Sequence, residues 1–80
     1  MTLTVKLFAR ARDLAGATVD VDVADGASVA ALRAALAAAR PALAGFLSRC
    51  AVAVNGEYAA DGHAVGPGDE VAVLPPVSGG

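Results

Sequence analysis

Apolar and polar residues alternate near both ends of the chain. Over residues 2–8 a leucine or valine occupies every second position, with threonine or lysine between them. The same alternation returns over residues 17–23, where valines alternate with aspartates, and over residues 70–74, around Val71 and Val73. A period of two is typical of a strand that buries one of its faces. We therefore predict three strands in these ranges, the first two being antiparallel neighbours that a loop joins.

A helical spacing replaces this alternation in the middle of the chain. Leu32 and Leu36 lie four positions apart within residues 29–39, as on the buried face of a helix. Ser28 is a suitable N-cap and Pro41 cannot continue the helix, so we predict a helix over residues 29–39. Most of its other residues are alanines, which favour helix but bury little surface. Leu32 and Leu36 are therefore expected to provide most of its packing.

Short elements are predicted between this helix and the last strand. Residues 41–47 are expected to add one more helical turn. The apolar residues 51–54 predict a short strand, and Asn55-Gly56 after them is the strongest hairpin signal in the chain. Residues 57–59 would return as a short edge strand.

The order of these elements predicts an α+β fold in one domain. A main helix packed across one face of a small mixed sheet, with a leading hairpin and a terminal strand, corresponds to the β-grasp, or ubiquitin-like, fold. In that arrangement the last strand lies parallel to the first. We expect the β-grasp domain to span residues 1–76, and residues 77–80 to form a flexible carrier tail that leaves one end of the sheet.

Composition narrows the class of protein. The chain has 80 residues, of which 56% are hydrophobic, so it is not a disordered segment. Its net charge is −2 and its basic residues form no concentrated positive run, which argues against nucleic-acid binding. The sequence has neither an apolar run long enough to span a membrane nor a signal-peptide pattern at its start. We expect a cytoplasmic protein that binds neither nucleic acid nor membrane.

The residues after the last predicted strand are the most informative part of the sequence. Leu74 is followed by Pro75 and Pro76, which hold a chain extended and lack backbone donors. The remaining residues are Val77, Ser78, Gly79 and Gly80. Two residues without side chains make a thin end that fits a narrow channel in another protein. We predict that the terminal carboxylate is a group to be delivered, although end glycines are also common as frayed or linker residues.

The chain offers few residues for catalysis of its own. Cys50 is the single cysteine, which excludes an internal disulfide, and it has neither a nearby histidine nor a CxxC spacing. We interpret it as a buried or incidental thiol. His63, the single histidine, is expected at the surface of a loop. The acidic residues follow strand faces and turns without a metal-binding cluster, so no metal site is expected.

Three segments carry a resemblance to a known family. They are the opening from Val5 to Gly16, the middle segment from Ala53 to Tyr58 and the ending from Gly68 to Gly80. Together they make the chain resemble the small, sulfur-carrying subunits of molybdopterin synthase, which are ubiquitin-like sulfur carriers. One departure lies just before the prolines, where the family often has aromatic residues and this chain has Val73 and Leu74.

The resemblance implies a carrier that its partners charge and discharge. An ATP-dependent, E1-like activating enzyme would adenylate Gly80, and a sulfur donor would then displace AMP to leave a thiocarboxylate. The thiocarboxylate would give its sulfur to cyclic pyranopterin monophosphate inside the large synthase subunit, and two such transfers would form the dithiolene of molybdopterin. A heterotetramer of small and large subunits is expected, with no cofactor bound to this chain. The general acid and base groups would belong to the partners.

Residues near the tail are candidates for docking. The predicted partner interface comprises Phe8, Arg10, Arg12, Leu74, Pro75 and Pro76. Core packing is the alternative for Phe8 and Leu74, whereas solvation at a strand end is the alternative for Arg10 and Arg12, which would otherwise orient an acidic partner loop. Val77 lies beyond the last strand, which favours an interface role. The residues predicted to thread a partner's channel are Val77, Ser78 and Gly79.

Other functions fit the same ending and stay open. Related sulfur carriers serve thiamine or cysteine synthesis, although the thiamine carrier lacks the pair of prolines. A ubiquitin-like modifier would use the same activated carboxyl end to join Gly80 to lysines of other proteins. A plain interaction module with a passive tail would tolerate truncation after Pro76.

Overall fold

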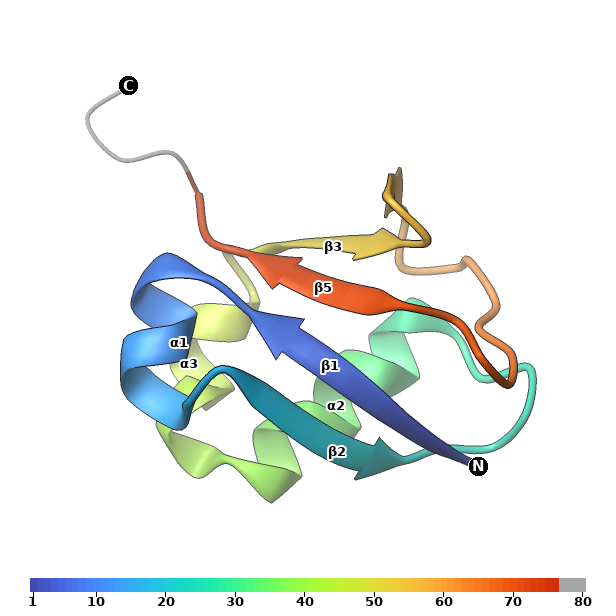
Figure 1. The fold of residues 1–80 in the computed structure, drawn as a ribbon, viewed down its shortest axis with the longest axis horizontal. Coiled ribbons are helices and arrows are strands. Elements are labelled where there is room, and N and C mark those ends of the chain that lie inside the picture. The colour runs from blue at the N-terminus through green and yellow to red at the C-terminus, as the bar shows by residue number, and fades with distance from the viewer. Residues whose placement is uncertain (77–80) are drawn as a thin grey trace.

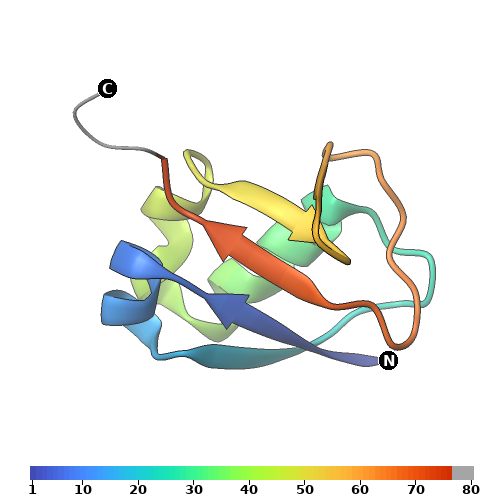
Figure 2. The same cartoon turned by 45° about the horizontal axis from the view of Figure 1, so that its top comes forward.

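The chain folds around a five-stranded mixed sheet with its helices on one side, as Figures 1 and 2 show from two directions. The computed structural model describes residues 1–76, and no helix within them is long and apolar enough to cross a membrane. The elements are β1 (Thr2–Leu7), α1 (Ala9–Ala15), β2 (Thr18–Asp22), α2 (Val29–Ala39), η1 (Pro41–Leu43), α3 (Ala44–Leu47), β3 (Ala51–Val54), β4 (Glu57–Ala59) and β5 (Val71–Leu74). The candidate residues Val77, Ser78, Gly79 and Gly80 lie outside the described residues, and their roles stay predictions.

The order of the strands across the sheet is β2-β1-β5-β3-β4. β1 and β5 are parallel neighbours, with Val5 opposite Val71 and Leu7 opposite Val73. All other strand pairs are antiparallel. The predicted parallel placement of the last strand beside the first is confirmed, and with it the β-grasp, ubiquitin-like fold.

The core lies between the sheet and α2. The inward-facing strand residues are all buried: Leu3, Val5, Leu7, Val19, Val21, Val52, Val54, Val71 and Val73. Leu32 and Leu36 of α2 are fully buried against them, and Leu43 of η1 is buried as well. Ser28 caps α2, because its hydroxyl accepts a hydrogen bond from the backbone N–H of Ala31 at 3.1 Å. The predicted bounds, cap and buried leucines of this helix are confirmed.

The segment between β1 and β2 differs from the prediction. The sequence predicts a loop, whereas residues 9–15 form the helix α1. Ala11 is fully buried and Leu14, three positions later, packs partly against the core. Phe8 occupies the N-cap position of α1 without a side-chain cap, and Ala9 has a left-handed φ of 49°, so the usual start signal is missing. Tertiary packing rather than capping therefore stabilises this short helix.

The hairpin between β3 and β4 is hydrogen-bonded to a second turn, which immediately precedes β5. Asn55 and Gly56 have φ of 52° and 83°, and a two-residue hairpin favours such residues because both positions need positive φ. The Asn55 side chain donates to Oδ1 of Asp69 at 3.0 Å and accepts from the backbone N–H of Glu70 at 2.9 Å. The other carboxylate oxygen of Asp69 accepts from the backbone N–H of Gly66 at 2.8 Å. Asp69 thus joins two turns that are separate in sequence.

These hydrogen bonds predict a specific loss of stability in acid. The bond from Gly66, followed by the bond from Asn55, lowers the pKa of Asp69 from its ordinary value of 3.8. A carboxyl group with a lowered folded-state pKa stabilises the fold above its unfolded pKa, and this contribution disappears as the pH falls through the folded pKa. We expect the thermal midpoint of the wild type to fall below about pH 4 more steeply than that of Asp69→Asn.

Thermal unfolding followed by circular dichroism from neutral to acid pH measures this difference. Asp13→Asn is the matched control, because Asp13 is exposed on α1 and lies outside the network of Asp69. Asp69→Asn should also be less stable than Asp13→Asn at pH 7, where the wild-type carboxylate is ionised. The same acid slope in Asp69→Asn and in the wild type would contradict the assignment.

Candidate docking surface beside the tail

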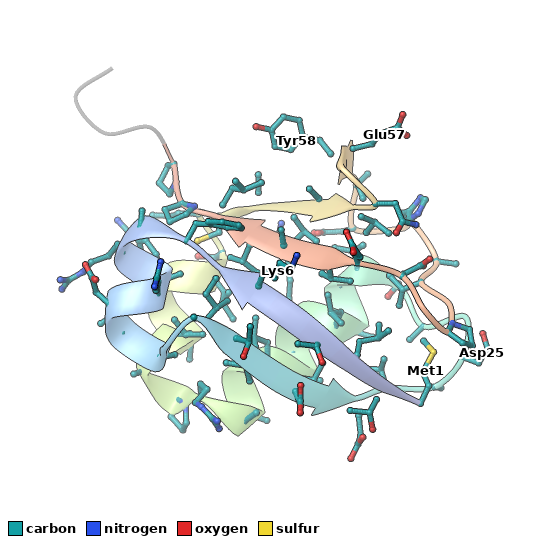
Figure 3. All side chains as sticks on the ribbon, viewed as in Figure 1. Met1, Lys6, Asp25, Glu57 and Tyr58 are labelled. Atoms are coloured by element: carbon teal, nitrogen blue, oxygen red, sulfur yellow. The ribbon has the colours of Figure 1, made fainter. Side chains whose placement is uncertain are left out.

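The sheet has an open face on the side away from the helices. Strand pairing places one row of side chains across all five strands on this face: Thr18, Lys6, Ala72, Ala53 and Tyr58. Tyr58 is 79% exposed, and Figure 3 shows its ring projecting from the edge of the sheet. Two alanines lie between Lys6 and Tyr58, so the middle of the row is small and apolar.

A second apolar row lies where the chain leaves the sheet. Leu74 of β5 pairs with Ala51 of β3, and both are half-buried on the open face. Phe8 follows β1 with an extended backbone (φ −127°, ψ 157°), so strand alternation places its ring on the same face. Because Leu7 pairs with Val73, Phe8 lies beside Leu74 one step further along. Phe8 is 43% exposed, which rules out the core-packing interpretation for this residue.

We call the apolar residues of these two rows the open-face patch. They are Phe8, Ala51, Ala53, Tyr58, Ala72 and Leu74. The patch adjoins the C-terminal end of β5, where Pro75 is half-buried and Pro76 is exposed. An exposed apolar surface of this kind is typical of a protein-binding site. The interface roles of Phe8, Leu74 and the two prolines stay predictions, but the structure does place them together.

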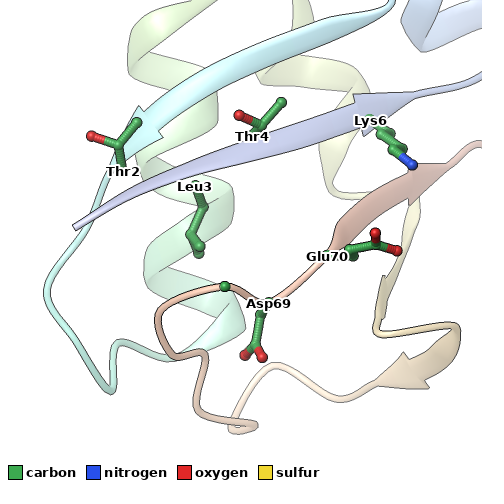
Figure 4. A pocket seen from close by; sticks show the side chains of 7 residues that line it. Thr2, Leu3, Thr4, Lys6, Asp69 and Glu70 are labelled. Atoms are coloured by element: carbon green, nitrogen blue, oxygen red, sulfur yellow. The ribbon is translucent and has the colours of Figure 1, made fainter.

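The other half of the open face is polar. The hydroxyls of Thr2 and Thr4 donate hydrogen bonds to Asp22 and Asp20 across the β1–β2 pair, at 2.5 Å and 2.7 Å. A hollow of about 310 Å³ lies between β1 and the turn before β5, lined by residues that include Thr2, Thr4, Lys6, Gly68, Asp69 and Glu70. Figure 4 shows these side chains from close by. The apolar part of the open face therefore lies toward the C-terminal end of β5.

The two arginines near the tail exit do not form a pair. Arg10 and Arg12 are both exposed, but they belong to α1 rather than to the loop that the sequence predicts. Residues two positions apart on a helix are about 200° apart around its axis, and the intervening Ala11 is buried. Arg10 and Arg12 therefore lie on different sides of α1. The contact of Arg10 and Arg12 with an acidic partner loop stays a prediction. Because the two side chains lie on different sides of the helix, a single loop does not contact both of them equally.

Neither Cys50 nor His63 gains a catalytic setting in the fold. Cys50 is buried, and burial raises the pKa of its thiol against the opposing effect of Arg33 and Arg49. A thiol with a raised pKa is a poor nucleophile at neutral pH, so the interpretation of Cys50 as a buried thiol is confirmed. His63 is exposed in a loop, as predicted. No group of three potential metal-ligating side chains occurs within residues 1–76.

Sequence reasoning missed the part of the patch that β3 and β4 contribute. Tyr58, which is 79% exposed, shares a face of the sheet with Phe8 only because β5 pairs with β1 on one side and with β3 on the other, and the buried Ala53 lies between Tyr58 and β5 in the same row. Alanines give no signal of their own in a chain so rich in them. Tyr58 did offer a signal in the sequence, since a large aromatic side chain in a three-residue edge strand can bury little of its surface in the core.

The chain is similar to known proteins over nearly its whole length. A family model described as the ThiS family matches residues 5–80. The molybdopterin synthase sulfur carrier subunit of Chlamydomonas reinhardtii is 41% identical over 83 residues, and the match covers 100% of both chains. Small archaeal modifier protein 1 of Haloferax volcanii is 44% identical over 84 residues, covering 94% of this chain and 97% of that protein. Its crystal structure superposes with a TM-score of 0.89, at 40% identity and with 100% of both chains covered.

The fold also matches a chain that was solved together with a partner. In the protein–protein complex of subunits 1 and 2 of molybdopterin-converting factor from Helicobacter pylori, the matching chain is 25% identical, with a TM-score of 0.70 and 100% of both chains covered. The resemblance to ubiquitin-like sulfur carriers, indicated by the opening, the hairpin and the ending of the sequence, is thereby confirmed. With a family model that covers residues 5–80 and a relative that is 41% identical from end to end, this chain belongs to the ThiS family.

Proposed function

We propose that this chain is the sulfur carrier subunit of a molybdopterin synthase and works in the cytoplasm. The observation that carries the proposal is its 41% identity to such a subunit over the full length of both chains. The open-face patch supports it, because an exposed apolar surface adjoins the point where Pro75 and Pro76 lead into the tail. A carrier needs such a surface, since its chemistry takes place inside other proteins.

The chemistry assigned to Gly80 begins with activation of its carboxylate. A carboxylate resists nucleophiles, because it is negatively charged and has no good leaving group. An ATP-dependent, E1-like enzyme transfers AMP to it and releases pyrophosphate, which leaves a mixed anhydride. A persulfide sulfur then attacks the carbonyl carbon and AMP departs. A thiol then attacks the donor's own sulfur, so that the sulfur–sulfur bond breaks, a disulfide forms between the thiol and the donor, and Gly80 is released as a thiocarboxylate.

Delivery of the sulfur completes the cycle in the large synthase subunit. The thiocarboxylate of Gly80 is nucleophilic and attacks cyclic pyranopterin monophosphate, and water then restores the carboxylate. Two sulfur atoms are needed for one dithiolene, which suits a heterotetramer with two copies of each subunit. In this proposal the chain binds no metal and no cofactor, and ATP is consumed by the activating enzyme. Residues 77–80 thread the active sites, while the open-face patch holds the body of the domain outside.

Intact-mass measurement tests the proposal directly. After incubation with ATP, an activating enzyme and a sulfur source, replacement of one carboxyl oxygen by sulfur should add about 16 Da. Tandem fragmentation should then place the added mass on Gly80. A parallel sample without ATP is the matched control and should keep its original mass. A shift that does not need ATP, or one located elsewhere in the chain, would contradict the proposal.

Threading of the tail predicts a penalty for added width at Gly79. We expect Gly79→Ala to slow sulfur loading about tenfold or more, because a methyl group in a narrow channel costs at least about 1.4 kcal/mol. Its thermal midpoint should not change, since Gly79 lies outside the domain formed by residues 1–76. Ser78→Ala is the matched control, because it changes the neighbouring position without adding width. Equal loading rates for the two variants, followed by intact mass, would count against threading.

A second candidate function is covalent modification of other proteins. It is favoured by the 44% identity to small archaeal modifier protein 1 and by the TM-score of 0.89 to its crystal structure. Such a modifier uses the same activated Gly80 but gives it to lysine amines instead of to a sulfur donor. A ladder of conjugates between a tagged chain and lysines of other proteins in cells supports this function. Loss of the molybdenum cofactor on deletion of the gene, without a ladder, supports the sulfur carrier alone.

A further inference from the structure

Lys6 is the single lysine among the 80 residues, which include five arginines. It lies near the middle of the open face, between Thr18 and Ala72, and it is exposed while its strand neighbours Val5 and Leu7 are buried. Figure 3 shows its amine clear of the ribbon on the viewer's side of the sheet. Within residues 1–76 the amine takes part in no ion pair, since the one salt bridge there is formed by an arginine.

The other primary amine of the chain is already engaged. The amino group of Met1 donates to the backbone oxygen of Val23 at 2.8 Å, and the residue is partly buried. Lys6, by contrast, is one of the residues that line the hollow on the open face, and Figure 4 shows its side chain there. Its cross-strand neighbours on the open face, Thr18 and Ala72, are small, so an incoming acyl group meets little steric hindrance. Lys6 is therefore the accessible amine nucleophile of the described chain.

We propose that Lys6 is the acceptor through which one copy of this chain is joined to the activated carboxyl end of a second copy. The proposal rests on the proposed function, which supplies Gly80 as an acyl-adenylate. The neutral amine of Lys6 attacks the carbonyl carbon of Gly80, a C–N bond forms and the C–O bond to AMP breaks. AMP leaves as the anion, and the amine loses a proton to water. The product is an isopeptide bond between Lys6 and Gly80.

The position of Lys6 gives this bond a regulatory consequence. Lys6 and Ala72 are cross-strand partners, and Ala72 belongs to the open-face patch. A second folded copy attached to Lys6 therefore stands over the surface that the sulfur-carrying cycle uses for docking. Conjugation at Lys6 and docking of the large subunit exclude each other, so the linkage withdraws the acceptor copy from sulfur transfer.

Peptide mapping after a reaction without a sulfur donor tests the acceptor. The chain is incubated with ATP and an activating enzyme, and the conjugates are digested with trypsin. Because Arg49 is the last tryptic site, a linked Lys6 should stay uncleaved and carry residues 50–80 as a branch. Lys6→Arg keeps the charge but removes the primary amine, and it should lose this conjugate. The conjugate yield of each variant is divided by the amount of thiocarboxylate that the same variant forms in a parallel sample with a sulfur donor. This ratio corrects for differences in activation of Gly80.

A relocated lysine distinguishes a specific acceptor from general reactivity. Lys6→Arg combined with Ala34→Lys moves the single lysine to the exposed outer side of α2. We expect a conjugate yield several-fold below that of the wild type. Equal yield from the relocated lysine, or conjugates of Lys6→Arg through Met1 at the wild-type level, would overturn the assignment. So would the absence of a Lys6 branch in a chain that does form thiocarboxylate.

Failure of the proposed function is separable from failure of this inference. If no thiocarboxylate forms, the carrier function is wrong, and a chain prepared with a chemical thioester at Gly80 replaces the adenylate in the same mapping experiment. A higher yield of the branch on Lys6 than on the relocated lysine then still supports Lys6 as the acceptor. Equal yields on the two lysines overturn that assignment. Binding of the purified conjugate to the large subunit tests the consequence. Affinity equal to that of the single chain would contradict the mutual exclusion.

Discussion

A chain that ends at Gly79 is expected to take up no sulfur. Loading begins at the terminal carboxylate, and removal of Gly80 retracts that group by one residue, about 3.5 Å in an extended chain. Reacting atoms must come within about 3.5 Å of each other, and a displacement of about 1 Å already costs on the order of a hundredfold in rate. The shortened carboxylate therefore misses the nucleotide in the activating enzyme. Intact mass after incubation with ATP, the enzyme and a sulfur source should show no gain.

Folding of the shortened chain provides the control for this prediction. The core and the open-face patch lie within residues 1–76, so the thermal midpoint should equal that of the wild type. In cells that lack the native protein, a version trimmed of both Gly79 and Gly80 should fail to restore the molybdenum cofactor. Sulfur loading of a chain ending at Gly79, at the rate of the wild type, would falsify the assignment of Gly80 as the carrier group.

Most of the fold could be predicted because its signals are local. The alternation around Val5 and around Val71 and Val73 reflects strands with one buried face, and burial in the structure follows it. Ser28 and Pro41 mark the two ends of α2 through capping and ring geometry, and the helix has the predicted bounds. Such signals need only a few neighbouring residues, so one sequence is enough to show them.

The elements that sequence reasoning missed depend on distant contacts. α1 has no cap, and its reason to be helical is the burial of Ala11 and Leu14 against a core that the rest of the chain provides. The link from Asp69 to Asn55 likewise joins two turns that become neighbours only after the sheet has formed. Neither contact leaves a periodic pattern in the sequence.

The sequence predicts a chemistry for the candidate site, which stays a prediction, but it does not predict the shape of the docking surface. The ending of the chain indicates Gly80 as the reactive group, and the exposure of Phe8 next to Leu74 agrees with the predicted position of an apolar surface. The contribution of Tyr58 required the strand order, because β4 is separated from β1 by β5 and β3. The separation of Arg10 from Arg12 required the knowledge that this segment is helical.

Phe8 offers a sharp test of the open-face patch, because it has two separate roles. Its ring belongs to the patch, whereas its backbone occupies the N-cap position of α1, where no side chain forms a cap. Aspartate is among the best N-cap residues and a poor residue for an apolar interface. Phe8→Asp is therefore expected to keep the fold, and the added cap offsets part of the packing that the ring provides.

Although Phe8→Asp should keep the fold, it should weaken binding to the large subunit. Truncating a central aromatic residue of an interface costs about 2 kcal/mol or more, and an unpaired carboxylate adds a desolvation cost, so we expect the Kd for the large subunit to rise at least roughly 30-fold. Isothermal titration calorimetry of the purified chain against the large subunit measures the change. Ala34→Asp is the matched control, since it adds the same charge at an exposed position of α2, on the side of the sheet away from the patch. If Phe8→Asp melts like the wild type and binds as tightly as Ala34→Asp, the docking surface lies elsewhere on the domain, and the proximity of the open-face patch to the tail has no part in binding.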